Sequence, residues 1–371
     1  MAEKQLRFAL IGCGRIALNH IAAAYDNWLS IVALCDINSQ SIDSLKKACK
    51  DKRPEILDTF DHARIYGDYH ALLESEMVDV IAIATPSGSH FEIARDCINK
   101  GLNVIIEKPI ALSVNESREL IALSREQKVC VTVCHQNRYN KSVKRLLEEV
   151  QADSFGKMNF GTIHVLWNRN QEYYTQAPWR GTWNDDGGFL MNQCIHCIDL
   201  LLWLMQSDVD EVKAYTANRS HSYIQTEDVG IAVLRFKNGA LGVIEGTSTI
   251  YPKNLEETLY LSGESGTVKL GGKSVNIIEE WNLARYDEQE SQAIKAEFHE
   301  NPPNIYGFGH SPLYADFIKA IQEQCEPMIT LEDASKAMEV VLALYKSEKD
   351  GVAVKLPLKN FATTDMAGYF D

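Results

Sequence analysis

The pattern of apolar and polar positions changes character near residue 156. Before that point, short apolar runs alternate with stretches of helical periodicity, the last of them a helix at about 114–127. Strands that alternate with helices are typical of a doubly wound parallel sheet. We therefore predict an α/β domain whose strands cover 6–11, 31–35, 78–84, 103–107 and 129–133.

After residue 156, strand-like runs follow one another, and turn signals such as Lys237-Asn238-Gly239 separate several of them. The runs cover 159–167, 209–219, 229–236, 240–249, 257–261, 268–270 and 275–281. This pattern predicts an α+β domain with a mostly antiparallel sheet, one face on helices and the other free to meet a partner subunit. Two helices, at about 312–324 and 331–349, close the chain. The expected domains are 1–135 and 136–371.

One long apolar stretch of the second domain, 186–204, reads as a buried helix that carries three polar residues. Spacings of four and three place Asn192, His196 and Asp199 on one face of a regular helix. Burying them is costly unless each finds a partner. The face either borders a polar pocket, or His196 is a core histidine held by Asp199.

The turn after the first strand has the pattern G-x-G-x-x-A, from Gly12 through Gly14 to Ala17. Between a strand and a helix, this pattern is the dinucleotide fingerprint. Gly12 makes the tight turn, Gly14 lets the backbone approach the pyrophosphate, and the helix N-terminus binds the phosphates. Asp36 ends the next strand, where an acid accepts hydrogen bonds from ribose hydroxyls and repels the extra phosphate of NADP. We therefore expect NAD. The alternative is a tight turn without a ligand.

Polar residues follow two further strands of the predicted parallel sheet. Thr85, Pro86 and His90 come after one strand, and Glu107 and Lys108 come after another. Ligands bind at the carboxyl ends of such strands, so both groups are expected beside the cofactor. A lysine there can orient a hydroxyl and stabilise negative charge on oxygen. Alternatively, Lys108 is a surface lysine paired with Glu107.

The composition restricts the partners. The 371 residues carry a formal net charge of −14, which disfavours nucleic acid and anionic membranes as partners. Nine cysteines form no spaced framework, and no targeting segment precedes the first strand. No apolar run is long enough to span a bilayer. We expect a cytoplasmic protein with reduced thiols.

Two polar stretches of this acidic chain, 136–140 and 168–183, are candidates for substrate contacts. They contain Arg138, Arg169 and Arg180 together with amides and aromatic residues, which suit an anionic substrate with a sugar or base ring. The alternative is a packed loop whose arginines pair with neighbouring acids.

The run Cys194-Ile195-His196-Cys197 does not predict a metal site, because a helix spreads these side chains over different faces. We expect no metal.

Several motifs are arranged as in a known family: Gly12-x-Gly14-x-x-Ala17, Thr85-Pro86, Glu107-Lys108-Pro109 and Gly187-Gly188 followed by His196 and Asp199. In these motifs the chain resembles the glucose–fructose oxidoreductase / inositol dehydrogenase (Gfo/Idh/MocA) family. The resemblance implies a Rossmann domain, a second domain with a large open sheet, and dimers or tetramers through that sheet. It also implies oxidation or reduction of a sugar-like hydroxyl with NAD or NADP.

The resemblance also suggests roles within the site. The family's lysine corresponds to Lys108 and its histidine to His196. Many members carry an aspartate where this chain has Asn192, which moves the role of proton acceptor towards His196, alone or with Lys108. Asp199 is then expected to orient His196.

A narrower resemblance rests on Gln136-Asn137-Arg138, Trp167-x-Arg169, Trp179-Arg180-Gly181-x-Trp183 and Tyr306-Gly307-Phe308-Gly309-His310. These motifs are similar to those of the UDP-N-acetylglucosaminuronate 3-dehydrogenases. The similarity implies NAD-dependent oxidation of the 3-hydroxyl of a UDP-sugar to a ketone, ahead of a transamination in surface-polysaccharide biosynthesis. The alternatives are a 3-dehydrogenase of UDP-N-acetylglucosamine, another sugar or polyol dehydrogenase, and an NAD-binding sensor without turnover.

The predicted site consists of three overlapping groups. Lys108 and His196 are the predicted catalytic residues. The predicted cofactor-binding residues are Gly12, Gly14, Arg15, Ile16, Asp36, Thr85, Pro86, His90, Glu107, Lys108 and Gln136. The predicted substrate-binding residues are Lys108, Arg138, Asn140, Arg169, Tyr173, Tyr174, Arg180, Asn192 and His196.

Overall fold

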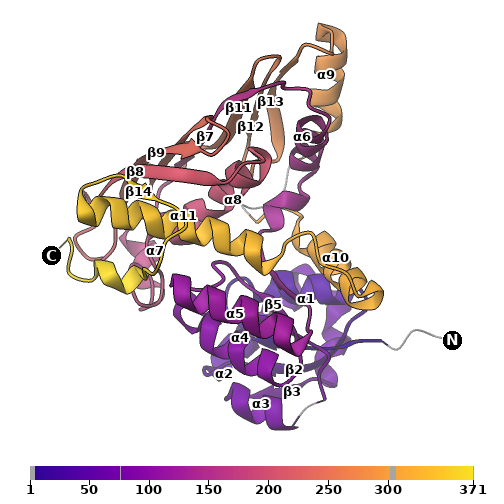
Figure 1. Cartoon of the computed structure of the whole chain (residues 1–371). Coiled ribbons are helices and arrows are strands. Elements are labelled where there is room, and N and C mark those ends of the chain that lie inside the picture. The colour runs from indigo at the N-terminus through magenta and orange to yellow at the C-terminus, as the bar shows by residue number, and fades with distance from the viewer. Residues whose placement is uncertain (1–4, 76, 301–305, 371) are drawn as a thin grey trace. The chain divides into compact units, whose positions relative to one another are not determined.

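The computed structural model describes residues 5–75, 77–300 and 306–370, which form two compact units (Figure 1). The first unit is built from the described parts of Met1–Ala111, Glu116–Cys134 and His310–Glu332. The second unit comprises the described parts of Leu112–Asn115, His135–Gly309 and Asp333–Asp371. The expectation that no targeting segment precedes the first strand falls on residues 1–4, outside the described residues.

A six-stranded sheet with the order β3-β2-β1-β4-β5-β6 forms the centre of the first unit, and all its strand pairs are parallel. The strands are β1 (Arg7–Ile11), β2 (Ser30–Cys35), β3 (Arg64–Tyr66), β4 (Val80–Ile83), β5 (Asn103–Ile106) and β6 (Val131–Val133). The helices between them are α1 (Ala17–Asp26), α2 (Ser39–Lys52), α3 (Tyr69–Ser75), α4 (His90–Asn99) and α5 (Val114–Gln127). The predicted doubly wound sheet is confirmed. Strand β3 and helices α2 and α3 were not predicted, because the apolar periodicity is weak there.

One further helix of the first unit comes from far along the chain. The predicted helix near 312–324 is α10 (His310–Glu323), and it packs on α1. The Tyr314 hydroxyl lies 2.7 Å from Nδ1 of His20, and the rings of Tyr314 and Phe8 lie 5.9 Å apart. Sequence order alone did not indicate that this helix joins the first unit.

The second unit contains an eight-stranded sheet with the order β13-β12-β11-β7-β10-β9-β8-β14. Its strands are β7 (Met158–Leu166), β8 (Val209–Ala217), β9 (Val229–Phe236), β10 (Leu241–Thr247), β11 (Glu256–Gly263), β12 (Gly266–Gly271), β13 (Ile277–Leu283) and β14 (Val354–Lys355). Among the described strand pairs of this sheet only β7–β10 is parallel, so the predicted mostly antiparallel sheet is confirmed.

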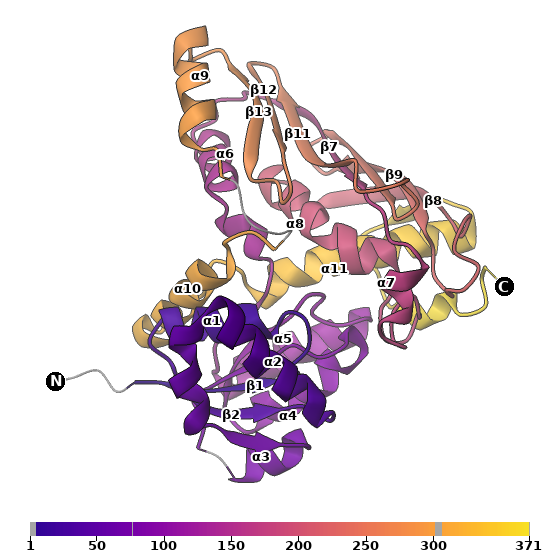
Figure 2. The same cartoon turned by 180° about the vertical axis from the view of Figure 1, so that it is seen from behind.

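The helices of the second unit are α6 (Lys141–Gln151), α7 (Gln171–Thr175), α8 (Ile195–Leu204), α9 (Glu288–Glu297) and α11 (Leu331–Asp350) (Figure 2). Helix α8 packs on β7 and β11. The opposite sides of β8, β9 and β10 leave apolar side chains in solvent: Ile231 is 51% exposed, Val233 55% and Tyr215 71%. The expectation that a second copy of the chain covers this face stays a prediction.

The stretch 186–204 is not one regular helix. Residues Leu190–Cys194 form a π-helical turn, and α8 follows from Ile195. The prediction of one regular helix is therefore wrong. That Asn192 and His196 share one face stays a prediction.

No helix in the described part of the chain is long and apolar enough to cross a membrane. The nine cysteines all lie among the described residues, and none of them forms a disulfide.

Two neighbouring acids of β11 point to opposite faces of the sheet and have opposite pKa shifts. Burial raises the pKa of Glu257 to about 8, only partly offset by a hydrogen bond from the Cys197 thiol. Burial also acts on Glu256, but a hydrogen bond from Thr258 and the charge of Lys269 outweigh it and lower the pKa. Glu257 is therefore protonated in the folded protein at neutral pH.

We predict that Glu257→Gln stabilises the protein progressively more as the pH rises from 5 to 8. In the unfolded chain Glu257 has a pKa of about 4.3 and releases its proton above that pH, whereas the folded protein keeps the proton up to about pH 8. The free energy of unfolding of the wild-type protein therefore falls between pH 5 and 8, and the glutamine variant avoids this loss. Thermal unfolding at pH 5, 7 and 9 should give an advantage of roughly 2 °C or more at pH 9. The control Glu256→Gln should show no such gain, and equal Tm differences at all three pH values would contradict the prediction.

Candidate active site

The main chain around Gly12 defines the carboxyl edge of the parallel sheet. Gly12 has φ +95°, and a Cβ there would lie 2.5 Å from the carbonyl carbon of Ala84. A Cβ added at Gly14 would meet nothing within 4 Å, so this glycine is open for close approach of a ligand. Helix α1 begins after Ile16, and no side chain caps its N-terminus, which is the part of such a helix that binds phosphates.

Asp36 lies at the carboxyl end of β2. Its Oδ2 accepts a hydrogen bond from the Cys13 N–H at 2.8 Å, and its Oδ1 accepts one from the Asn38 N–H at 2.8 Å. A carboxylate has about four lone-pair sites, so both oxygens can still accept ribose hydroxyls. Together with the open Gly14 and the uncapped helix, this arrangement fits NAD.

His90 joins the two loops that follow β4 and β5. Its Nδ1 lies 2.8 Å from the Pro109 carbonyl oxygen, and its Nε2 lies 3.0 Å from the Thr85 carbonyl oxygen. Burial lowers the pKa of this histidine. Because both ring nitrogens face main-chain carbonyls, His90 holds the loops of Thr85-Pro86 and Lys108-Pro109 together. The geometry argues against the predicted cofactor contact of His90.

Glu107 and Lys108 occupy different environments although they are neighbours. The Glu107 side chain is buried between His20 and His310, whereas Lys108 is half-buried at the sheet edge. The carboxylate of Glu107 accepts a hydrogen bond from the Lys108 main-chain N–H at 3.2 Å. Glu107 therefore faces the interior, and the expectation that it touches the cofactor is not supported by this orientation.

Two arginines of the second unit pack around one tyrosine. The guanidinium carbon of Arg180 lies 4.0 Å from the ring centre of Tyr173, and that of Arg169 lies 5.1 Å from the same point. Arg169 also stacks on Trp167 at 4.5 Å. Such cation–π contacts hold guanidinium groups in place without consuming their hydrogen-bond donors.

Several donors of this arginine pair have no hydrogen-bond partner among the described residues. They are buried nitrogen atoms: Nε and Nη1 of Arg180, and Nε of Arg169. Burial lowers the pKa of Arg169, and the nearby tyrosines only partly offset this effect. Buried donors without partners are costly, so the pair can bind an anion or another acceptor.

A chain of hydrogen bonds extends from the arginine pair to Asn192. Arg169 donates to Oε1 of Gln193 at 3.1 Å, and the Gln193 amide donates to the Tyr173 hydroxyl at 3.1 Å and to Oδ1 of Asn192 at 2.6 Å. The Asn192 amide nitrogen donates to Asp186. The structure thus brings together four predicted substrate residues: Arg169, Tyr173, Arg180 and Asn192.

Three other predicted substrate residues have partners within the second unit that argue against a role in binding. Arg138 is 2% exposed and forms a bidentate pair with Asp199, at 2.8 and 2.7 Å, as well as a 3.2 Å contact with Asp333. The Asn140 amide donates to the Ser274 carbonyl at 2.6 Å. The Tyr174 hydroxyl donates to Ser248 Oγ at 3.3 Å, and its ring is buried.

His196 lies beside a residue that the sequence did not indicate. The rings of His196 and His135 meet edge to face at 5.9 Å, and Nδ1 of His135 lies 3.8 Å from the Asp199 carboxylate. Asp199 accepts hydrogen bonds from Arg138 with both oxygens, and the expectation that it orients His196 stays a prediction. Gln136, which follows His135 in the chain, is 2% exposed, and its Oε1 has no hydrogen-bond partner among the described residues.

The sequence also missed Gln193, which connects Arg169, Tyr173 and Asn192. Gln193 directly follows Asn192, and regular helical spacing turns neighbouring side chains away from each other.

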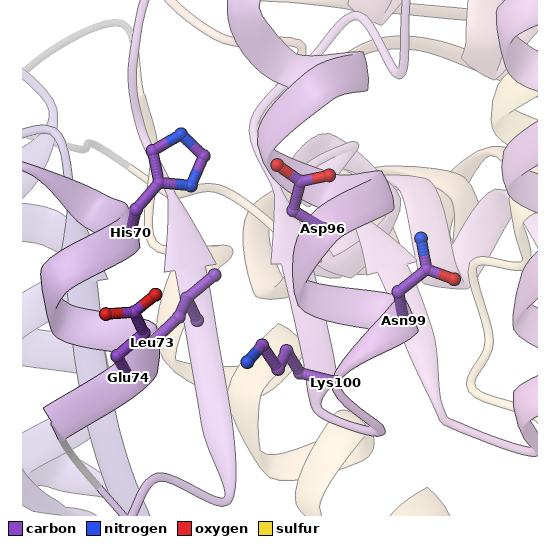
Figure 3. A pocket seen from close by; sticks show the side chains of 6 residues that line it. All are labelled: His70, Leu73, Glu74, Asp96, Asn99 and Lys100. Carbon is purple, nitrogen blue, oxygen red and sulfur yellow. The ribbon is translucent and has the colours of Figure 1, made fainter.

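Two hollows lie within the separate units. Figure 3 shows a cavity of about 210 Å³ between α3 and the end of α4, lined by His70, Leu73, Glu74, Asp96, Asn99 and Lys100. Helix α4 begins after β4 and ends before β5, so this cavity lies at the sheet edge opposite Gly12. In the second unit, a cavity of about 550 Å³ borders Arg138, Asp199 and Trp203.

Comparison with known proteins agrees with this arrangement. Residues 6–135 match the description "Oxidoreductase family, NAD-binding Rossmann fold", and residues 143–269 match "GFO/IDH/MocA C-terminal domain". A similar solved structure is the crystal structure of the WlbA dehydrogenase from Bordetella pertussis in complex with NADH and UDP-GlcNAcA. Its sequence is 34% identical to this chain. The match covers 97% of this chain and 100% of that chain, with a TM-score of 0.86. The chain belongs to the Gfo/Idh/MocA family.

Other Gfo/Idh/MocA relatives act on smaller substrates. D-apiose dehydrogenase from Paraburkholderia graminis is 24% identical over 95% of this chain and 90% of its own length. Myo-inositol 2-dehydrogenase from Thermotoga maritima is 24% identical over 95% of this chain and 98% of its own length. The family models identify this chain as an NAD-binding oxidoreductase of the family.

We predict that Gly14→Ala weakens NADH binding by about tenfold or more without loss of stability. A methyl group at Gly14 meets no protein atom within 4 Å, but it occupies the surface that the pyrophosphate approaches. NADH fluorescence titration and thermal unfolding measure the two effects separately. Gly67→Ala is the control, because its Cβ also meets nothing within 4 Å, far from the fingerprint turn in sequence. Unchanged NADH affinity in Gly14→Ala would contradict the assignment.

Proposed function

We propose that this Gfo/Idh/MocA member oxidises the 3-hydroxyl of UDP-N-acetylglucosaminuronate to a ketone, a step of nucleotide-sugar biosynthesis for surface polysaccharide. The observation that carries this proposal is the arginine pair around Tyr173, in which Nε and Nη1 of Arg180 and Nε of Arg169 are buried and lack hydrogen-bond partners among the described residues. The WlbA dehydrogenases of Bordetella pertussis and Chromobacterium violaceum, 34% and 33% identical, are complexes with NADH and UDP-GlcNAcA.

An anionic substrate explains why a chain of net charge −14 places these arginine donors against aromatic rings rather than against its many carboxylates. The planar guanidinium groups of Arg169 and Arg180 can donate in parallel to a carboxylate or a phosphate. The aromatic faces of Trp167 and Tyr173 fix the direction of these donors. The same geometry favours an anionic sugar over an uncharged one.

The chemistry assigns different tasks to the polar residues. NAD⁺, when bound, accepts a hydride from C3 of the sugar. His196 accepts the proton of the 3-hydroxyl, alone or coupled to Lys108, and the Lys108 ammonium stabilises negative charge that develops on the oxygen. An amide cannot accept that proton. Asn192, already donating to Asp186, holds a sugar hydroxyl through its carbonyl oxygen or acts through Gln193.

A second candidate is oxidation of a substrate whose sugar carries no carboxylate, either UDP-N-acetylglucosamine or a free polyol. The observation that favours it is the similarity over nearly the whole chain to inositol and apiose dehydrogenases. In that case the donors of Arg169 and Arg180 would meet the diphosphate or sugar hydroxyls rather than a carboxylate.

We predict that Lys108→Ala and His196→Ala each reduce kcat by about 10²-fold or more, because both take part in proton transfer or charge stabilisation. Reduction of NAD⁺ is followed by absorbance with UDP-N-acetylglucosaminuronate, UDP-N-acetylglucosamine and myo-inositol. Thermal unfolding of the variants serves as a control for folding. Turnover of only the substrates without a sugar carboxylate would reject the uronate, and NAD binding without turnover of any candidate would identify a sensor.

We predict that Arg180→Gln raises KM at least tenfold for the uronate but less than threefold for UDP-N-acetylglucosamine, since a charged hydrogen bond to the carboxylate is lost only with the former. The matched control is Arg125→Gln, whose side chain is 70% exposed in the first unit. Equal KM changes for the two UDP-sugars would show that Arg180 does not bind the sugar carboxylate.

A further inference from the structure

Four buried side chains from separate parts of the first unit meet next to Lys108. They come from α1, from the ends of β5 and β6, and from the first residue of α10, and they are His20, Glu107, Cys134 and His310. Their nitrogen, oxygen and sulfur atoms all lie within 4.8 Å of one another. Neither the cofactor fingerprint nor the proposed substrate cluster accounts for them.

Two hydrogen bonds and one further polar contact hold Glu107 at the centre of this cluster. Nε2 of His20 lies 3.1 Å from Oε1 of Glu107, and Nε2 of His310 lies 3.5 Å from the same oxygen. The other oxygen accepts the Lys108 main-chain N–H at 3.2 Å. Since the Nε2–H of His20 donates to a carboxylate, its Nδ1 accepts from the Tyr314 hydroxyl at 2.7 Å when the ring is neutral.

The cluster keeps Glu107 ionised. Burial alone would raise the pKa of Glu107, but the hydrogen bonds from His20 and His310 outweigh burial and hold this pKa well below its usual range. Burial lowers the pKa of His310, so this ring is neutral near pH 7. A buried carboxylate is a local negative charge that solvent screens only weakly.

The charges of Glu107 and Lys108 act on the same neighbours. Burial raises the pKa of the Cys134 thiol, the charge of Glu107 raises it further, and the charge of Lys108 lowers it. Burial lowers the pKa of His90, the charge of Glu107 raises it, and that of Lys108 lowers it. The carboxylate and the ammonium are therefore close enough to affect a common surrounding.

We propose that Glu107 is a positioning residue for Lys108: it fixes the lysine main chain and supplies the buried negative charge that keeps the ammonium protonated. His20 and His310 hold the carboxylate in place, and Tyr314 holds His20. The inference rests on the proposed function in taking Lys108 as the catalytic lysine. It adds that α10, which comes from late in the chain, acts on that lysine through Glu107.

The test is the titration of Lys108 in Glu107→Gln, a variant of the same shape without the charge. The lysines are reductively methylated with ¹³C, and the Lys108 resonance is assigned by its absence in Lys108→Arg. Loss of a nearby opposite charge disfavours the ammonium, so the pKa of Lys108 should fall by about 1 unit or more. The alkaline limb of the kcat–pH profile should move in the same direction. Glu126→Gln, an exposed acid of α5, should leave both unchanged.

An unchanged Lys108 titration in Glu107→Gln would overturn the proposal, even if kcat fell. If that variant does not fold, His310→Gln and His310→Leu provide a second comparison. The glutamine can still donate to Glu107 and should keep the wild-type titration, whereas the leucine should shift it, and equal titrations in both would contradict the proposal.

The same four side chains could also form a zinc donor set. About one equivalent of zinc per chain, measured by elemental mass spectrometry of the purified protein, would therefore overturn the positioning role. The lysine titration needs no sugar substrate. Failure of the wild-type protein to oxidise any sugar nucleotide would thus reject the proposed function while the coupling of Glu107 to Lys108 is still measured.

Discussion

The close approach of the backbone at Gly12 to the backbone at Ala84 is the constraint on which the NAD-binding edge of the first unit depends. The Ile11 carbonyl accepts from the Ala84 N–H at 2.7 Å, and the Gly12 N–H donates to the Cys35 carbonyl at 2.8 Å, so β1 is held between β2 and β4 up to its last residue. The strand order reverses at β1, and ligands of such sheets bind at that point. Thr85 and Lys108 reach the same edge because β4 and β5 run parallel to β1.

The arginines of the second unit differ in what neutralises them. Arg138 has two carboxylates and is an internal ion pair, whose disruption would leave a buried charge. Arg169 and Arg180 have aromatic faces and amides instead. Identical residue types in nearby stretches therefore separate into one that stabilises the fold and two that remain available to a ligand.

The sequence was sufficient where a periodic pattern decides the structure. The parallel and antiparallel sheets followed from alternation, and the fingerprint placed Gly12, Gly14 and Asp36 at one sheet edge. It was insufficient for Arg138, His90 and Asp199, because their partners are far apart in sequence or are main-chain carbonyls. The π turn at Leu190–Cys194 could not be foreseen either, since the apolar run around Asn192 fits a regular helix equally well.

The return of α10 to the first unit affects how the chain can be divided. A fragment ending at residue 135 would lack Tyr314 and Phe317, both 0% exposed in the intact chain, and would leave apolar surface on α1 uncovered. It would also lack His310, one of the two histidines that hold Glu107. A chimaera that exchanges the nucleotide-binding unit between relatives must therefore transplant α10 together with the segments before residue 135.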